Sequence, residues 1–129
     1  MKHEAYIGTI MPQPGAPIEV FLYRGPGTSS YFSMGSAVDK EKPSIFIAYD
    51  PEWPEVASSS LHEIFEYCMM LSQCGYDPSI ASMPAYSNRC FFMTHQQFSE
   101  ICDNSSDAWQ QLEPMLKPVW EKWKKEKKK

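Results

Sequence analysis

The residues whose types and spacing best suit chemistry are His62, Glu63 and Glu66, within the stretch Ser-Leu-His-Glu-Ile-Phe-Glu-Tyr-Cys over 60–68. If this stretch is helical, positions 62 and 66 lie about one turn apart on the same face. A histidine nitrogen and a carboxylate oxygen placed in this way can bind one metal ion. The spacing therefore predicts a metal site on a helix, with the carboxylate of Glu63 beside it.

The order of these residues also suits hydrolysis. It is the order of the zinc-protease helix His-Glu-x-x-His, with Glu66 in the place of the second histidine. A zinc hydrolase needs three protein ligands, an open position for water and a base near that water. Apart from His3 near the N-terminus, the remaining histidine is His95. The sequence thus predicts Zn²⁺ bound by His62, Glu66 and His95. Glu63, next to a ligand, is then the general base that activates the metal-bound water.

Simpler interpretations need no metal. An acidic helix produces this pattern readily by chance, with Glu63 and Glu66 as a solvated face, and His95 can donate to a carbonyl near a helix start. Other nucleophiles have less support. Cys90 lies five residues from His95, but nothing in the sequence fixes the lowered thiol pKa and the positioned base that a cysteine nucleophile needs. The serines at 58–60 lack the Gly-x-Ser-x-Gly turn of a serine hydrolase.

The candidate site is expected on a long helix that follows a buried strand. Residues 44–49 are short and apolar, as in a central strand. The helix is predicted over 54–74, from a proline that suits the first turn to the residue before a glycine. Its geometry places His62 and Glu66 at the border of the apolar stripe and Glu63 further toward solvent. The stripe consists of Ala57, Leu61, Ile64, Phe65, Cys68 and Leu71.

Further strands and helices are expected around this pair of elements. Segments 5–10, 17–24 and 31–34 have the β-branched and aromatic residues of strands, and 75–88 is expected to be a loop that forms a lid over the site. Thr94 and Gln97 have the spacing of a capping box. The expected C-terminal helical segments are 95–103, 108–116 and 119–123, with a break or kink at 104–107. The fold class is therefore predicted as α+β, a small antiparallel or mixed sheet packed against a long helix, with C-terminal helices.

Composition indicates a globular chain with an acidic body. The 129 residues are 43% hydrophobic and 22% charged, which is typical of one domain, expected over 1–120. The lysine-rich tail at 121–129 carries a net charge of +4, which leaves −8 on the rest. We therefore expect no nucleic-acid partner, because such binding requires neutralised phosphates. The oligomeric state is not determined by the sequence.

The compartment is inferred from segments that the sequence lacks. The chain has no apolar run of membrane-spanning length, and the N-terminus lacks the apolar core of a signal peptide, so we expect no membrane association. The four cysteines contain no C-x-x-C pair and are expected to be free thiols. The predicted localisation is cytoplasmic.

The order of these motifs resembles that of small zincin-like metallopeptidases of phages and prophages. The matching features are the strand at 45–47 followed by Asp-Pro at 50–51, the helix with Leu-His-Glu-Ile-Phe-Glu at 61–66, and Thr-His-Gln-Gln-Phe at 94–98. The resemblance covers residues 44–103. It implies a zincin-like core in which His62, Glu66 and His95 are metal ligands and Glu63 is the base.

Two functions are consistent with these observations. The first is a zinc-dependent hydrolase, a peptidase, whose extended peptide or protein substrate lies along 44–49. The second is a non-catalytic phage-type accessory or inhibitor protein, which uses the same fold as a protein-binding module. In the second case the acidic body and the tryptophan-bearing C-terminus form the partner surface.

Overall fold

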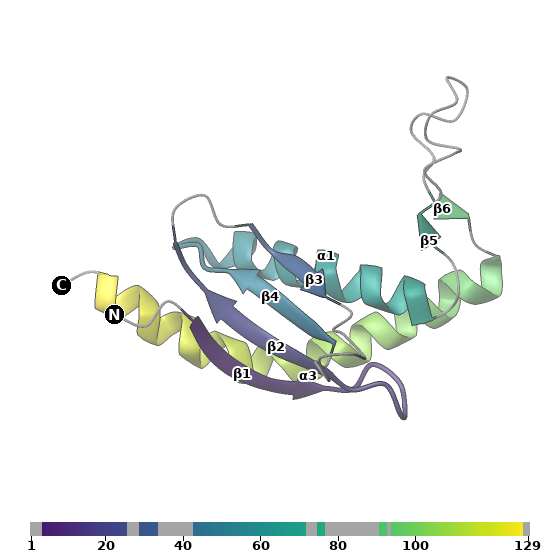
Figure 1. Cartoon of the computed structure of the whole chain (residues 1–129), viewed down its shortest axis with the longest axis horizontal. Coiled ribbons are helices and arrows are strands. Elements are labelled where there is room, and N and C mark those ends of the chain that lie inside the picture. The colour runs from purple at the N-terminus through teal and green to yellow at the C-terminus, as the bar shows by residue number, and fades with distance from the viewer. Residues whose placement is uncertain are drawn as a thin grey trace, which may run out of the picture.

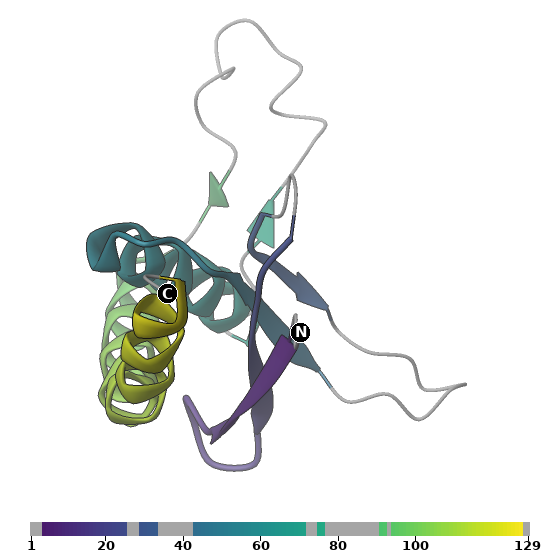
Figure 2. The same ribbon diagram turned by 90° about the vertical axis from the view of Figure 1, so that its left-hand side faces the viewer.

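The computed structural model describes residues 4–25, 29–33, 43–71, 75–76, 91–92 and 94–127. Two helices lie on the same side of a four-stranded sheet (Figures 1 and 2). The elements are β1 (Glu4–Ile10), β2 (Ile18–Tyr23), β3 (Tyr31–Ser33), β4 (Ser44–Ala48), α1 (Trp53–Leu71), β5 (Gly75–Tyr76), β6 (Phe91–Phe92) and α3 (His95–Lys127). The structure thus confirms the α+β class, with a mixed sheet packed against a long helix.

The sheet has the strand order β1-β2-β4-β3. β1 and β2 are antiparallel, β2 and β4 are parallel, and β3 is antiparallel to β4. β4 is therefore an interior strand, as expected from its apolar sequence. The expectation that an extended substrate lies along 44–49 is wrong, because β2 and β3 occupy the two sides of β4. Just before β3 begins, the Ser30 hydroxyl accepts a hydrogen bond from the Ala48 backbone N–H at 2.9 Å.

The core lies between the sheet and the helices. Alternate residues of β2 and β4 point toward the helices and are fully buried, because side chains along a strand face opposite sides in turn. Burying an aliphatic side chain of this size contributes about 1.5–3 kcal/mol. The buried set includes Val20, Leu22, Ile45 and Ile47 from the sheet, Val56, Ile64 and Cys68 from α1, and Ile101, Leu112 and Leu116 from α3.

The predicted strands agree with β1, β2, β3 and β4 to within one residue at each end. The predicted helix at 54–74 corresponds to α1, although residues 72–74 lie outside the described residues. The loop expected at 75–88 begins differently, because Gly75 and Tyr76 form β5 and pair with β6. Residues 77–90, including the rest of the proposed lid, lie outside the described residues.

The C-terminal segments form one continuous helix, so the break expected at 104–107 is wrong. The buried positions Ile101, Ser105, Ala108 and Leu112 are four, three and four residues apart, which carries one buried face through the polar run. The prolines inside the helix, at 114 and 118, are exposed. Packing of the buried face offsets the hydrogen bonds that these prolines remove.

The two ends of α3 are fixed by different contacts. At its start, the Thr94 N–H donates to Gln97 Oε1 at 2.8 Å and the Gln97 N–H donates to Thr94 Oγ1 at 3.1 Å, which confirms the predicted capping box. Near its end, Trp123 is buried, so the helix packs against the core beyond residue 120. The predicted tail at 121–129 therefore begins as part of α3. No helix in the part of the chain that the structure describes is long and apolar enough to span a bilayer.

The start of α1 is held in place by α3. The indole N–H of Trp120 donates to the backbone carbonyl of Asp50 at 2.8 Å, and its ring lies 5.2 Å from that of Trp53. The carboxylate of Asp50 accepts a hydrogen bond from the Glu52 N–H at 2.8 Å. These contacts fix the connection between β4 and α1, the helix that carries the candidate site.

Candidate metal centre

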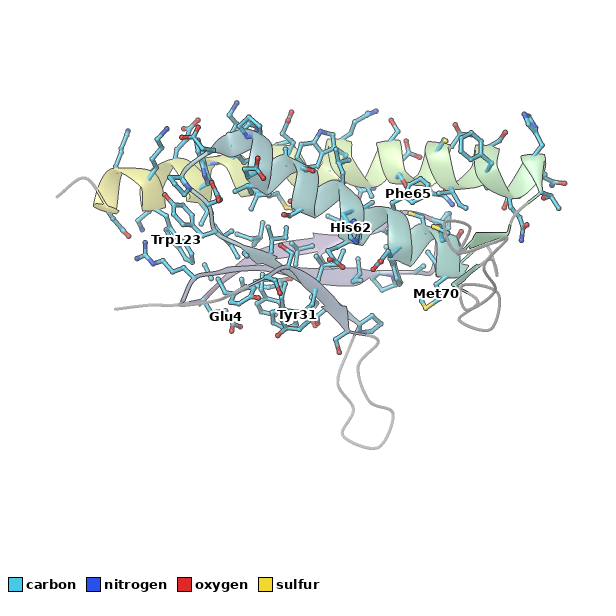
Figure 3. The ribbon with its side chains drawn as sticks, turned by 90° about the horizontal axis from the view of Figure 1, so that it is seen from above. Glu4, Tyr31, His62, Phe65, Met70 and Trp123 are labelled. Atoms are coloured by element: carbon cyan, nitrogen blue, oxygen red, sulfur yellow. The ribbon has the colours of Figure 1, made fainter. Side chains whose placement is uncertain are left out.

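Helix α1 brings His62, Glu63 and Glu66 together. One ligand atom from each of the three side chains lies within 4.8 Å of the other two. His62 Nε2 is 3.2 Å from Glu66 Oε1, the contact expected for residues four apart on a helix. Figure 3 shows His62 in the middle part of α1. The chain therefore has a compact group of histidine and carboxylate side chains that can hold a metal ion.

The three side chains differ in exposure. The side chains of His62 and Glu66 are 67% and 43% exposed, whereas Glu63 is only 5% exposed. The expectation that Glu63 lies further toward solvent is wrong. The group thus combines two solvent-accessible side chains with one buried carboxylate.

The orientation of α1 explains this difference. Its buried residues include Val56, Ser60, Glu63 and Tyr67, spaced four, three and four apart, whereas Leu61 of the predicted stripe is exposed. A search for apolar residues alone misses this face, because two of its members are polar. The Ser60 hydroxyl donates to the Val56 carbonyl at 2.7 Å, which satisfies it inside the helix.

Burial changes the protonation of Glu63. Its pKa is raised mainly by desolvation and further by the nearby Glu66 carboxylate, while His62 opposes these effects. The ionised form of Glu63 is disfavoured because the carboxylate is poorly hydrated and close to a second carboxylate. A cation bound between the two carboxylates would relieve both effects. The donor types, one imidazole and two carboxylates, fit zinc and also other first-row metal ions.

A weak electrostatic effect of Glu63 on a tyrosine is not predicted from the sequence. The pKa of Tyr23, at the end of β2, is raised mainly by burial and then by Tyr31, and Glu63 makes the smallest of the raising contributions. The Tyr23 hydroxyl donates to the Ser29 carbonyl. The Tyr23 ring lies on the side of the sheet away from the helices, 5.9 Å from the ring of Tyr31 and 6.3 Å from that of Phe46, so it is not part of the group.

His95 lies elsewhere among the described residues. It is exposed and is the first residue of α3, which starts past the C-terminal end of α1 (Figure 1). It does not belong to the group formed by His62, Glu63 and Glu66. The assignment of His95 as the third ligand stays a prediction from the sequence.

Comparisons of the chain with protein-family models, with curated proteins and with solved structures find no match. Of the features behind the zincin-like resemblance, the structure brings together His62, Glu63 and Glu66, and no relative supports the family.

Proposed function

We propose that the chain is a zinc-dependent hydrolase that cleaves peptide bonds, with His62 and Glu66 as metal ligands and Glu63 as the general base. The observation that carries this proposal is the placement of the buried Glu63 carboxylate within 4.8 Å of ligand atoms of two solvent-accessible side chains. A metal ion bound by His62 and Glu66 would be accessible to substrate from solvent. The Glu63 carboxylate would lie close to it on the buried side.

Each side chain has a defined task in this scheme. His62 binds through a neutral imidazole nitrogen, and Glu66 supplies a carboxylate oxygen one helical turn away. When bound, zinc supplies a water of lowered pKa and polarises the substrate carbonyl. Glu63 takes up the proton during attack and returns it to the leaving amine, the task of a general base beside the metal-bound water.

The third ligand is the part of the proposal that requires a separate test. The zincin-like resemblance assigns this place to His95, whereas the side chain next to His62 and Glu66 is Glu63. If His95 is a ligand, His95→Ala lowers the zinc content of the purified protein. If Glu63 is the ligand instead, His95→Ala retains zinc and Glu63→Gln loses it.

The decisive experiment measures zinc content and proteolysis on the same preparations. We expect the unmodified chain to retain zinc after dialysis and to cleave a fluorescent casein substrate. Glu63→Gln should keep zinc and lose about 10²–10⁴-fold in rate, the usual contribution of a general base. Glu55→Gln, at an exposed position of the same helix, is the matched control and should leave both unchanged. A chain without zinc would remove the hydrolase proposal.

A second candidate function is a protein-binding module without catalysis. It is favoured by the exposure of His62 and Glu66, because an exposed pair four residues apart on a helix forms without a metal. In this case Glu63→Gln changes neither the metal content nor the binding of a partner.

A further inference from the structure

The face of the sheet opposite the helices carries a row of aromatic rings. Phe21 and Phe46 stack at 5.0 Å between ring centroids with planes 11° apart, and Phe46 and Tyr31 stack at 4.6 Å and 14°. Tyr6 packs against Phe21 at 5.4 Å. Each neighbouring pair in the row is also a register pair of adjacent strands, so the row crosses all four strands. We call this surface the aromatic face.

The aromatic face exists because the helices take the other side of the sheet. Residues that alternate with the row, such as Val20 and Ile45, are completely buried beneath α1 and α3. The two ends of the row remain accessible, since Tyr6 is 55% and Tyr31 is 47% exposed. Of the helices that the structure describes, neither lies over this face (Figure 2). Cross-strand pairs stabilise a sheet, but an apolar row with half-buried central rings and exposed ends also marks a docking surface.

The charged side chains that the four strands place on this face are carboxylates. Glu4 and Glu19 stand two residues before Tyr6 and Phe21, and so lie on the same side of the sheet as the row. The segments β1, β2, β3 and β4 contain neither lysine nor arginine. The aromatic row is thus bordered by carboxylates and has no basic side chain from its own strands.

These features argue against two kinds of occupant. A second copy docked face to face would bring the carboxylates of the strands together, and the strands supply no basic partner for them. A single-stranded nucleic acid needs neutralised phosphates and free ring faces on which bases stack. Here the ring of Phe46 is covered on one face by Phe21 and on the other by Tyr31. The row therefore presents ring edges, against which apolar side chains pack.

We propose that the aromatic face docks a partner protein segment in which apolar side chains are flanked by arginine or lysine. The apolar side chains cover the ring edges of the row. The basic groups pair with Glu4 and Glu19 and approach the outer rings, Tyr6 and Tyr31, where a guanidinium gains a cation–π contact. This proposal does not depend on the metal group of α1, because none of these residues belongs to it.

The test uses the full chain and defined synthetic peptides. The first peptide alternates leucine and arginine, the second has glutamate in place of arginine, and the third has serine in place of leucine. We expect the first to bind, with weaker binding at higher salt, and to shift the amide NMR signals of β1 to β4. The second and third should bind more weakly by at least about tenfold, because each lacks one of the two required contacts.

Variants of the chain locate the binding surface. Tyr31→Ser should weaken binding of the first peptide about tenfold, as for an aromatic anchor, and Glu19→Gln about threefold, as for an exposed ion pair. Phe98→Ser and Glu100→Gln, exposed positions on α3, are the matched controls and should leave affinity unchanged. Glu19→Gln leaves the rings in place, so the test holds even if Tyr31→Ser unfolds the edge strand.

Several outcomes would overturn the proposal. They are absence of binding by the leucine–arginine peptide, equal binding of all three peptides, and equal affinity of the chain and its Glu19→Gln variant. Tighter binding of oligothymidylate than of the first peptide would assign the face to single-stranded nucleic acid. Self-association that Tyr31→Ser abolishes would assign it to a second copy of the chain.

Discussion

The hydrogen bond from Trp120 to the Asp50 carbonyl joins the end of α3 to the segment that leads into α1. We predict that Trp120→Phe destabilises the chain by about 2–3 kcal/mol. The phenyl ring has no N–H, so the bond is lost and costs about 1 kcal/mol, because the half-buried Asp50 carbonyl can then be reached by water. The smaller ring leaves a gap beside Trp53 and costs a further 1–2 kcal/mol or so, the range for losing a small part of a buried side chain.

Urea denaturation followed by circular dichroism measures this change. The midpoint should fall while the slope of the transition stays constant, because the surface exposed on unfolding hardly changes. In a chain of this length the loss corresponds to a thermal midpoint lowered by about 10 °C. Trp109→Phe is the control, since Trp109 is half-buried on the same helix and its ring lies 6.3 Å from that of Trp53. A loss below about 0.5 kcal/mol for Trp120→Phe, or an equal loss for Trp109→Phe, would refute the reasoning.

Three further predictions concern the capping box and the metal centre. Thr94→Ala removes the side-chain acceptor of the capping box and should lower stability by about 1 kcal/mol, measured by urea denaturation. In metal-free protein the pKa of Glu63 is higher in the folded state than in the unfolded state, because the buried side chain favours its neutral form. The contribution of Glu63 to the free energy of unfolding is therefore fully present below the unfolded-state pKa and is lost as the pH rises through the folded-state pKa. Glu63→Gln should remove this decline in thermal melts recorded from acidic to neutral pH, and an unchanged decline would contradict the assignment. Zinc at about a hundred times its Kd should raise the melting midpoint by about 10 °C, and His62→Ala should abolish the rise.

Local patterns in the sequence are sufficient to predict most of the strands and helices. The alternation in 18–23 and 44–48 predicts strands because side chains along a strand face opposite sides in turn. The capping box at Thr94 predicts the start of α3 because both of its hydrogen bonds join residues three apart. These interactions span few residues, so neighbouring residues determine them.

The predictions that are wrong concern which face of a helix is buried and where a helix ends. The apolar residues of α1 predict a stripe that leaves Glu63 toward solvent, whereas the buried face of α1 includes Ser60 and Glu63. The break expected at 104–107 is absent because Ser105 and Ala108 face the core and continue the buried side of α3. In both cases the buried face of the helix is set by contacts with elements that are distant in the sequence.

The spacing of His62 and Glu66 is enough to place their side chains next to each other on one helix, because four residues make about one helical turn. The burial of Glu63 beside them does not follow from this spacing, since it depends on how α1 is rotated against the sheet and α3. The aromatic face likewise requires the register of four strands, which brings Tyr6, Phe21, Phe46 and Tyr31 into one row from positions spread over 40 residues of chain. Helical and strand periodicities are local properties, whereas burial and cross-strand register arise from packing between distant segments.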